Sequence, residues 1–341
     1  MRAMILTKTT KMNPDSEPLL QVDLPIPEPA ENEVLLKISA CGVCHTELDE
    51  IEGRTPPSHF PMILGHQVVG KIAALGKSVQ DFSVGERLGV AWIFSACGKC
   101  EYCLSGRENL CPDFLATGRD ANGGYAEYMT VPVRFSYRIP EIFKDIEAAP
   151  LLCAGAIGYR SLHLTHIQDG DRLGLTGFGA SAHLVLKLIR FKFPHTRVYV
   201  FARSETERKF ALEQGAVWAG DTTDPSPDKL HAIIDTTPVW KPVVEALRNL
   251  APGGRLVINA IRKESADQME LLKIQYPEHL WMEKEIKSVA NVTREDVRDF
   301  LKIAAEIPIK PEVEVYPLAQ ANQALRDLKF RSVRGAKVLT L

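Results

Sequence analysis

Residues 172–182 read RLGLTGFGASA, and this stretch decides the fold of the region around it. Its apolar start is typical of a buried strand, and residues 181–191 continue with apolar side chains at helical spacing. A strand that passes through a glycine turn into a helix is the context that a dinucleotide-binding fingerprint requires. Gly177 permits the tight turn, Gly179 lets the backbone approach a pyrophosphate, and Ala182 supplies the small residue needed for helix–strand packing. Alone, the string is a weak signal.

Strands and helices alternate beyond this turn. Strand-like segments occupy 197–204, 231–238 and 253–260, and helix-like segments occupy 205–215 and 242–250. This alternation predicts a parallel sheet of the doubly wound kind. In that setting, dinucleotide binding becomes the favoured interpretation of the glycine turn.

The end of the second strand indicates which dinucleotide is bound. An NAD site usually carries an acidic residue about twenty residues beyond the glycines, but Ala202 occupies that position. The guanidinium of Arg203, which Ser204 follows, could pair with a 2′-phosphate. The sequence therefore favours NADP(H), with NAD(H) as the alternative. In a third interpretation, Arg203 stacks on adenine or faces water.

Four cysteines within residues 95–113 predict a metal site. They follow a Cys-x₂-Cys-x₂-Cys-x₇-Cys pattern, at Cys97, Cys100, Cys103 and Cys111. Four thiolates can close a tetrahedral shell around one Zn²⁺ at about 2.3 Å per bond, and metal binding would order a segment that has few apolar side chains. A closed shell has no position for substrate, so we expect a structural zinc. A disulfide pair is the alternative that the tight spacing disfavours.

The remainder of the chain predicts a second kind of domain. Short strands separated by Gly and Pro fill residues 1–154, which favours a β-rich, barrel-like domain. A helix over 293–307 and a strand over 337–341 close the chain. We expect 1–154 and 291–341 to form one domain and 155–290 to form the other.

Composition limits the partners of the protein. A chain of 341 residues with a net charge of −2 lacks the basic footprint of a nucleic-acid-binding protein. No apolar run approaches the roughly twenty residues of a membrane span, and the N-terminus lacks the features of a signal peptide. We therefore expect a cytoplasmic protein with neither nucleic acid nor membrane as a partner.

Three residues that are far apart in the sequence offer a second metal site: Cys44, His66 and Cys153. Two thiolates and one imidazole make a three-ligand zinc set with an open fourth position. In that position a metal acidifies an alcohol or polarises a carbonyl. Spacing alone cannot connect these residues, and an isolated Cys or His is more often part of a core.

A family resemblance connects them. Besides the four-cysteine pattern, the chain contains G-V-C-H-T-E at 42–47, G-H-Q at 65–67, L-C-A-G at 152–155 and G-F-G-A-S-A at 177–182. With these motifs it resembles, over essentially its whole length, the zinc-dependent alcohol dehydrogenases of the medium-chain dehydrogenase/reductase superfamily. The resemblance assigns Cys44, His66 and Cys153 to a catalytic zinc and leaves Cys41 outside both metal sites.

The resemblance also implies a fold and an activity. We expect a GroES-like β-barrel catalytic domain and a Rossmann cofactor domain, with the active site in the cleft between them. Hydride would pass between a nicotinamide cofactor and a small alcohol, aldehyde or ketone. Two zinc ions per subunit and a homodimer or homotetramer are the further expectations.

Four neighbouring residues acquire roles through the same resemblance. His45 would present a cation to the cofactor pyrophosphate, and Thr46 would take the alcohol proton. Trp92 would form an aromatic wall of the substrate pocket, and Lys337 would make a further phosphate contact. A core role for Trp92 and a solvated side chain for Lys337 are the alternatives.

Three departures from the family pattern affect the expected chemistry. Glu47 replaces the usual Asp that orients a zinc ligand, and Gln67 replaces a Glu, which removes a negative charge close to the metal. Asp49 stands where many members have a relay histidine, and the ordinary pKa of a carboxyl group suits proton transfer near neutrality less well. We expect slower turnover or an unusual pH optimum.

Two other functions fit parts of the sequence. A zinc-free quinone or enoyl reductase would use the same scaffold, and a scaffolding protein could keep the cysteine lobe without catalysis. The complete set of Cys44, His66 and Cys153 argues against the reductase, and together with the glycine turn it argues against the scaffolding protein.

Overall fold

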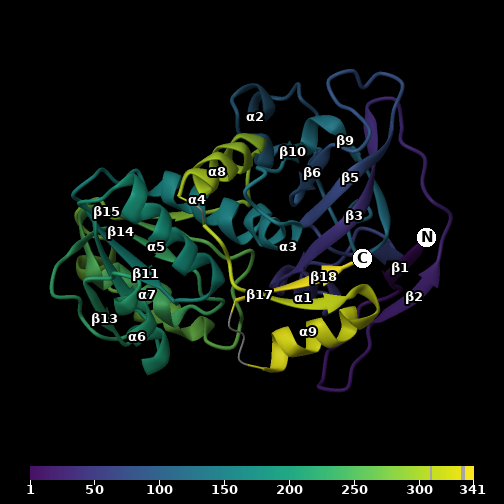
Figure 1. Ribbon diagram of the computed structural model, residues 1–341. Coiled ribbons are helices and arrows are strands. Elements are labelled where there is room, and N and C mark those ends of the chain that lie inside the picture. Colours follow the sequence, from purple (N-terminus) through teal and green to yellow (C-terminus); the bar gives the residue numbers. More distant parts are fainter. Residues whose placement is uncertain (308, 332–334) are drawn as a thin grey trace. The chain divides into compact units, whose positions relative to one another are not determined.

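The computed structural model of the protein describes residues 1–307, 309–331 and 335–341 (Figure 1). The described residues form two compact units. Residues 1–156 and 292–341 make up the first unit, and residues 157–291 make up the second. Among the described residues, no helix combines the length and the apolar character that crossing a bilayer requires.

A parallel sheet forms the centre of the second unit. In this fully described stretch, six strands follow the order β13-β12-β11-β14-β15-β16. Their bounds are β11 (Arg172–Thr176), β12 (Arg197–Phe201), β13 (Trp218–Gly220), β14 (Leu230–Asp235), β15 (Leu250–Ile258) and β16 (Glu285–Ser288). All neighbours run parallel, and Thr176 lies opposite Asp235 where β11 meets β14. The predicted doubly wound parallel sheet is confirmed, and β11 and β14 flank the point where the strand order reverses.

Helices connect these strands. Their bounds are α5 (Ala180–Lys192), α6 (Glu205–Glu213) and α7 (Lys241–Asn249), followed by the 3₁₀ helix η4 (Gln268–Lys273) and the π-helix η5 (Tyr276–Leu280). The longer α4 (Ala154–Thr165) crosses the boundary between the two units in the sequence. The middle strands of the sheet are continuous apolar runs because helices of a doubly wound fold cover both sheet faces.

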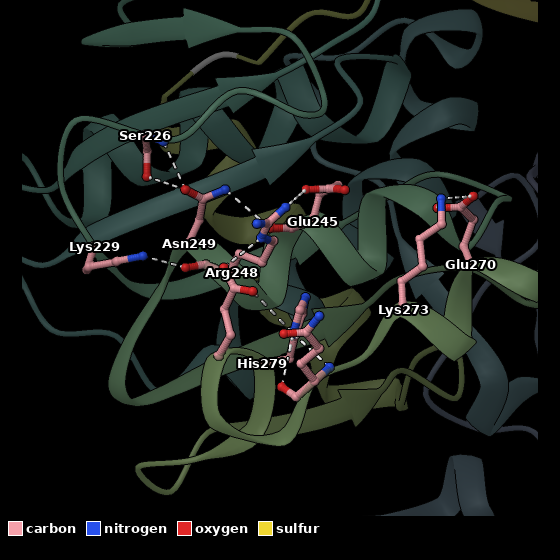
Figure 2. A network of polar contacts seen from close by, with 10 residues as sticks. Ser226, Lys229, Glu245, Arg248, Asn249, Glu270, Lys273 and His279 are labelled. Atoms are coloured by element: carbon pink, nitrogen blue, oxygen red, sulfur yellow. Dashed lines mark hydrogen bonds and ion pairs between the residues drawn. The ribbon is translucent and has the colours of Figure 1, made fainter.

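A polar network fastens the end of α7 (Figure 2). The Arg248 guanidinium donates to the carboxylates of Glu245 and Glu278, at 3.3 and 2.9 Å. Lys229 donates to the Arg248 carbonyl, and the Ser226 hydroxyl donates to the Asn249 side chain. Exposed ion pairs each contribute little to stability. Most of the stabilisation of α7 must therefore come from its packing on the sheet.

Mainly antiparallel sheets form the first unit, in which β17 and β18 pair parallel. In the described residues of this unit, the larger sheet follows the order β10-β6-β5-β3-β18-β17, with β9 also paired to β3, and smaller sheets join β2-β1-β4 and β7-β8. The strand bounds are β1 (Arg2–Leu6), β2 (Leu19–Asp23), β3 (Glu33–Val43), β4 (Met62–Ile63), β5 (Val68–Leu75), β6 (Arg87–Val90), β7 (Ile93–Ser95), β8 (Leu115–Ala116), β9 (Tyr128–Pro132), β10 (Ser136–Arg138), β17 (Val313–Pro317) and β18 (Ala336–Thr340). The last strand, β18, pairs antiparallel with β3 and places Lys337 opposite Val43. The C-terminal segment therefore completes the sheet that leads into Cys44.

Short helices surround these sheets. Their bounds are α1 (His45–Ile51), α2 (Glu101–Leu104), η1 (Glu108–Leu110), η2 (Val133–Phe135), α3 (Asp145–Ala148), η3 (Ala149–Leu152), α8 (Arg294–Glu306), η6 (Leu318–Gln320) and α9 (Ala321–Phe330). A capping box at Thr293 and Asp296 starts α8. The arginine that follows Thr293, Arg294, forms an ion pair with Glu108 and so ties α8 to the cysteine lobe.

Two strands of the parallel sheet were not expected from the sequence. β13 has only three residues, and β16 reads EIKS with every residue exposed. An edge strand that is exposed on both faces has no apolar pattern, and a three-residue strand is too short to show one. The strand expected over 253–260 begins earlier, as β15 at Leu250.

We expect Glu52→Gln to destabilise the first unit. The Glu52 carboxylate ends α1 and accepts hydrogen bonds from Lys329 of α9, from Arg54 and from the Met12 N–H group. Burial alone would raise the pKa of Glu52, but Lys329, Arg54 and Met12 outweigh it and lower this pKa from 4.5 to about 2. The lowered pKa stabilises the fold above pH 4.5, and this stabilisation is lost as the pH falls toward 2.

The loss of unfolding free energy should be about 1 kcal/mol at pH 7, after allowance for solvent screening. Urea unfolding of wild type and variant between pH 7 and pH 3 measures it, with the exposed Glu141→Gln as control. The difference should shrink below pH 4.5, and a constant difference would contradict the assignment.

Candidate active site and metal centres

The four cysteines of the lobe come together. Their sulfur atoms all lie within 4.8 Å of one another, and Cys97 Sγ is 3.9 Å from Cys103 Sγ. Ligand atoms that surround a tetrahedral metal at about 2.3 Å lie about 3.8 Å apart. All four thiols are free, so the structure contains no disulfide in this lobe. The separation of Cys97 and Cys103 fits a closed metal shell and not a bonded pair.

Backbone N–H groups prepare the lobe for thiolate. The N–H groups of Lys99 and Cys100 lower the pKa of Cys97 to about 6. Burial raises the pKa of Cys103 to about 12. A bound cation would favour the thiolate form of both, because metal coordination deprotonates a thiol.

A second group of three ligands forms at one end of α1. Cys44 is the N-cap residue of α1, His66 lies in the turn between β4 and β5, and Cys153 follows η3. His66 Nε2 lies 3.6 Å from Cys44 Sγ and 3.3 Å from Cys153 Sγ. Among the described residues, these three and the lobe cysteines are the groups that could hold a metal ion. Three ligands leave a fourth position for another molecule.

Glu47 orients the histidine. Its Oε1 atom lies 2.7 Å from His66 Nδ1, and its Oε2 atom accepts a hydrogen bond from the backbone N–H of Cys44 at 2.8 Å. The side chains of Glu47 and His66 are fully buried, with 0% and 1% exposed. A carboxylate at Nδ1 fixes the tautomer and turns Nε2 toward the thiols, as at zinc–histidine sites in general.

A glycine permits the turn that carries His66. Gly65 has φ = +95°, and a Cβ atom there would lie 2.5 Å from the Tyr125 ring and 2.9 Å from Cys41 Sγ. Only glycine fits this conformation and this space. Cys41 is fully buried behind the turn and belongs to neither metal group.

The protonation of these ligands reflects their crowding. A hydrogen bond with Cys153 and burial raise the pKa of Cys44. Burial disfavours a charged His66, but Glu47 and Cys44 outweigh it, and the pKa of His66 is raised. These pKa shifts therefore follow from the burial and the close packing of the ligands.

The other predicted residues of this unit lie in different surroundings. Thr46 follows Cys44, donates its backbone N–H to Cys44 Sγ at 3.4 Å, and is half-buried, whereas His45 is exposed. Asp49 is buried and pairs with the Arg54 guanidinium at 2.6 Å. Trp92 packs against Phe114 at 5.1 Å between ring centres.

Lys337 has partners of its own. Its ammonium donates to Glu314 Oε2 at 2.5 Å and to the Tyr316 hydroxyl at 2.9 Å, and 3% of the side chain is exposed. The alternative that the Lys337 side chain is solvated is therefore excluded. A phosphate contact would have to compete with Glu314, and it remains a prediction.

One buried carboxyl group was missed in the sequence. Glu50 of α1 is fully buried, and neither carboxyl oxygen has a hydrogen-bond partner among the described residues. Burial first and Glu47 second raise the pKa of Glu50 well above its usual range. The only sequence signal was a third acidic residue in the seven-residue segment HTELDEI.

The glycine turn lies at the carboxyl end of β11. Gly177 has φ = +76°, and a Cβ atom there would lie 3.0 Å from Thr236 Oγ1. Gly179 is the N-cap of α5, an added Cβ would meet nothing within 4 Å, and Ala182 is fully buried. The turn therefore has open space beside Gly179 at the start of a helix, where a pyrophosphate would bind.

The end of β12 carries the residues predicted to select the dinucleotide. Ser204 is the N-cap of α6 and accepts the Glu207 N–H. Arg203 is exposed and has no hydrogen-bond or ion-pair partner for its guanidinium in the described chain. Arg208 instead donates to the carbonyls of Ala202 and Arg203 and so fixes the backbone there.

Comparison with known proteins gives the family. The alcohol dehydrogenase GroES-like domain matches residues 30–141. The chain is 42% identical to the probable alcohol dehydrogenase AdhA of Mycobacterium tuberculosis, over 96% of this chain and 94% of that protein. It is 33% identical to an alcohol dehydrogenase of Geobacillus stearothermophilus, over 92% and 93% of the two chains. A solved cinnamyl alcohol dehydrogenase of Sorghum bicolor superposes with a TM-score of 0.82 at 25% identity, over 99% and 97%.

The chain therefore belongs to the zinc-dependent alcohol dehydrogenases of the medium-chain dehydrogenase/reductase superfamily. It is an NAD(P)-dependent oxidoreductase of alcohols and carbonyl compounds. The expected fold class, a GroES-like domain with a Rossmann sheet, is confirmed.

We expect Glu47→Gln to weaken metal binding by Cys44, His66 and Cys153. Loss of a carboxylate that orients a ligand histidine lowers metal affinity by about 10- to 100-fold. Competition with a chelating dye measures zinc release, and Glu101→Gln, an exposed carboxylate of α2, is the control. A release curve identical to that of wild type would show that Glu47 does not support the site.

We expect Cys103→Ser to release metal from the lobe only. The variant should hold one metal ion fewer and unfold at a lower temperature, because the lobe has few apolar contacts to replace the metal. Metal analysis and thermal unfolding measure both effects. Cys41→Ala, a buried cysteine outside both groups, should keep the full metal content. Unchanged metal content in Cys103→Ser would refute the lobe as a metal site.

Proposed function

We propose that the protein is an NADP(H)-preferring alcohol dehydrogenase that acts on small alcohols, aldehydes or ketones with zinc held by Cys44, His66 and Cys153. The observation that carries this proposal is the meeting of these three ligands beside the buried Glu47 carboxylate. A three-ligand site with an open fourth position is the catalytic type of zinc site.

Zinc in this position supplies Lewis-acid chemistry, which acidifies an alcohol or polarises a carbonyl. Thr46 would accept the proton of the alcohol through its hydroxyl, because it lies two residues after Cys44, bonds Cys44 Sγ through its backbone N–H and is only half-buried. Trp92 would limit the size of the substrate pocket with its ring. Its indole N–H is buried and has no partner among the described residues, so a polar group of a substrate or a water could accept from it.

Asp49 remains our candidate for the proton relay. What supports it is its place in α1, three residues after Thr46. Its ion pair with Arg54 stabilises the carboxylate, so the relay would require Arg54 to release it during proton uptake. Glu50, whose pKa is raised by burial and by Glu47, is the neighbouring alternative.

The cofactor proposal rests on Arg203. What supports NADP(H) is a guanidinium free of protein partners at the end of β12, where a 2′-phosphate would lie, together with the absence of an acidic residue at Ala202. His45 and Lys337 are proposed as further contacts of the cofactor phosphates. The exposed position of His45 suits that role better than the paired ammonium of Lys337.

The lobe cysteines would hold a second, structural zinc, which gives two per subunit. Free thiols are typical of proteins in a reducing compartment, and they support our proposal that the protein is cytoplasmic. We further propose a homodimer or a homotetramer, the states that are usual in the family.

We expect Arg203→Ala to raise the Kd of NADPH by about tenfold and to leave the Kd of NADH unchanged. Fluorescence titration measures both constants, and Lys209→Ala, an exposed lysine of α6, is the control. The wild-type rate with each cofactor across a panel of aldehydes and ketones tests the activity itself.

Equal or better rates with NADH would overturn the cofactor preference. Absence of turnover with every carbonyl compound in a protein that holds both metals would overturn the proposed substrate class.

A further inference from the structure

We propose that Lys263 positions the nicotinamide half of the dinucleotide site. Lys263 follows β15, and its ammonium forms a buried ion pair with Asp235, the last residue of β14. The pair holds residues 236–239 against the glycine turn, and we call this Lys263–Asp235 pair the clamp. The proposal rests on the proposed function, since it requires a nicotinamide dinucleotide to bind at this edge of the sheet.

The ammonium uses all its donors inside the protein. Besides the Asp235 carboxylate, Lys263 Nζ donates to the carbonyl of Thr237 at 2.7 Å and to that of Val239 at 3.1 Å. The Lys263 side chain is 7% exposed and that of Asp235 is 0% exposed. A lysine has three N–H donors, so this ammonium has none left for a ligand. Lys263 therefore acts by positioning other groups.

Asp235 joins the clamp to the strand that carries the glycine turn. Its other oxygen, Oδ1, accepts the hydroxyl groups of Thr176 at 2.5 Å and of Thr237 at 2.7 Å. Thr176 is the last residue of β11 and the register partner of Asp235. One buried carboxylate thus connects β11, β14 and the segment after β14.

The clamped segment touches the glycine turn directly. The hydroxyl and the backbone N–H of Thr236 both donate to the Thr176 carbonyl, at 2.9 and 3.1 Å. A Cβ atom at Gly177 would lie 3.0 Å from Thr236 Oγ1 and 3.1 Å from Thr237 Cγ2. A shift of this segment would therefore change the wall beside the turn.

The strand order decides which half of the dinucleotide the clamp affects. In a doubly wound sheet the pyrophosphate binds at the first glycine turn, and the adenosine ribose lies at the end of the next strand. That strand is β12, which ends at Phe201, two residues before Arg203, and it flanks β11 on the side opposite to β14. The nicotinamide half then lies on the β14 side, over residues 236–239.

The test compares the binding of the complete cofactor, NADPH, with the binding of its adenosine half. Lys263→Met should raise the Kd of NADPH by about tenfold, because a displaced segment 236–239 would lose its contacts with the nicotinamide half. The Kd of 2′,5′-ADP, which fills only the adenosine half, should change less than the Kd of NADPH. Fluorescence titration and calorimetry measure the two constants, and bound zinc is counted in each sample.

A variant of Lys284 controls for the loss of lysine hydrogen bonds to backbone carbonyls in general. Lys284 also donates to two carbonyls of this unit, those of Leu247 and Glu278, but at the start of β16. Lys284→Met should leave the Kd of NADPH unchanged. Because Lys263→Met leaves Asp235 buried without its counter-ion, the pair Lys263→Met/Asp235→Asn is measured as well, and it should show the same selective loss of NADPH binding.

The outcomes separate this inference from the proposed function. If wild type binds neither NADPH nor 2′,5′-ADP, the NADP(H) proposal fails. If wild type binds both and the double variant binds NADPH equally well, only the positioning role of Lys263 is overturned. An equal loss of NADPH and 2′,5′-ADP binding overturns it too, because a change in the nicotinamide half must spare the adenosine half.

Discussion

The contact between Glu47 and His66 is the interaction on which the proposed active site depends. Glu47 bonds the Cys44 backbone with one oxygen and faces the His66 ring with the other, so it fixes two of the three ligands relative to each other. Both side chains are buried, and a buried carboxylate beside two thiols requires positive charge nearby. Protons can supply it, but a divalent cation supplies it at the point where both sulfur atoms and Nε2 converge. The same contact that orders the protein therefore favours metal binding.

The charge around this site is distributed unlike the family pattern. Gln67 removes the carboxylate that usually follows the ligand histidine, while Glu50 adds a buried carboxyl group from α1. Burial and the neighbouring Glu47 raise the pKa of Glu50 well above its usual range. In the proposed site, Glu47 would support the metal through His66, and Glu50 would be able to hold a proton. Asp49 differs from both because Arg54 neutralises it.

What could be predicted from the sequence was local. The lobe cysteines lie within one short segment and the glycine turn lies between a strand and its helix, so their spacing carries the signal. Cys44, His66 and Cys153 needed a family resemblance, because a cap of α1, a turn after β4 and the end of η3 meet only through the fold. The partner of Lys337 could not be predicted, since Glu314 faces it through the β17–β18 register. Lys263 was missed for the same reason, because its contacts lie on β14 and on the turn that follows it.

The two metal groups differ in what surrounds them, and this difference separates their roles. Backbone N–H groups of the lobe stabilise the thiolate of Cys97, and all four ligands of the lobe are cysteine sulfur atoms. The other group draws its support from a buried carboxylate on α1 and combines two sulfur ligands with one nitrogen. Four thiolates satisfy a tetrahedral ion completely, whereas three mixed ligands leave it able to exchange its fourth ligand. This difference supports our proposal that the chemistry occurs at the second group and that the lobe serves the integrity of the fold.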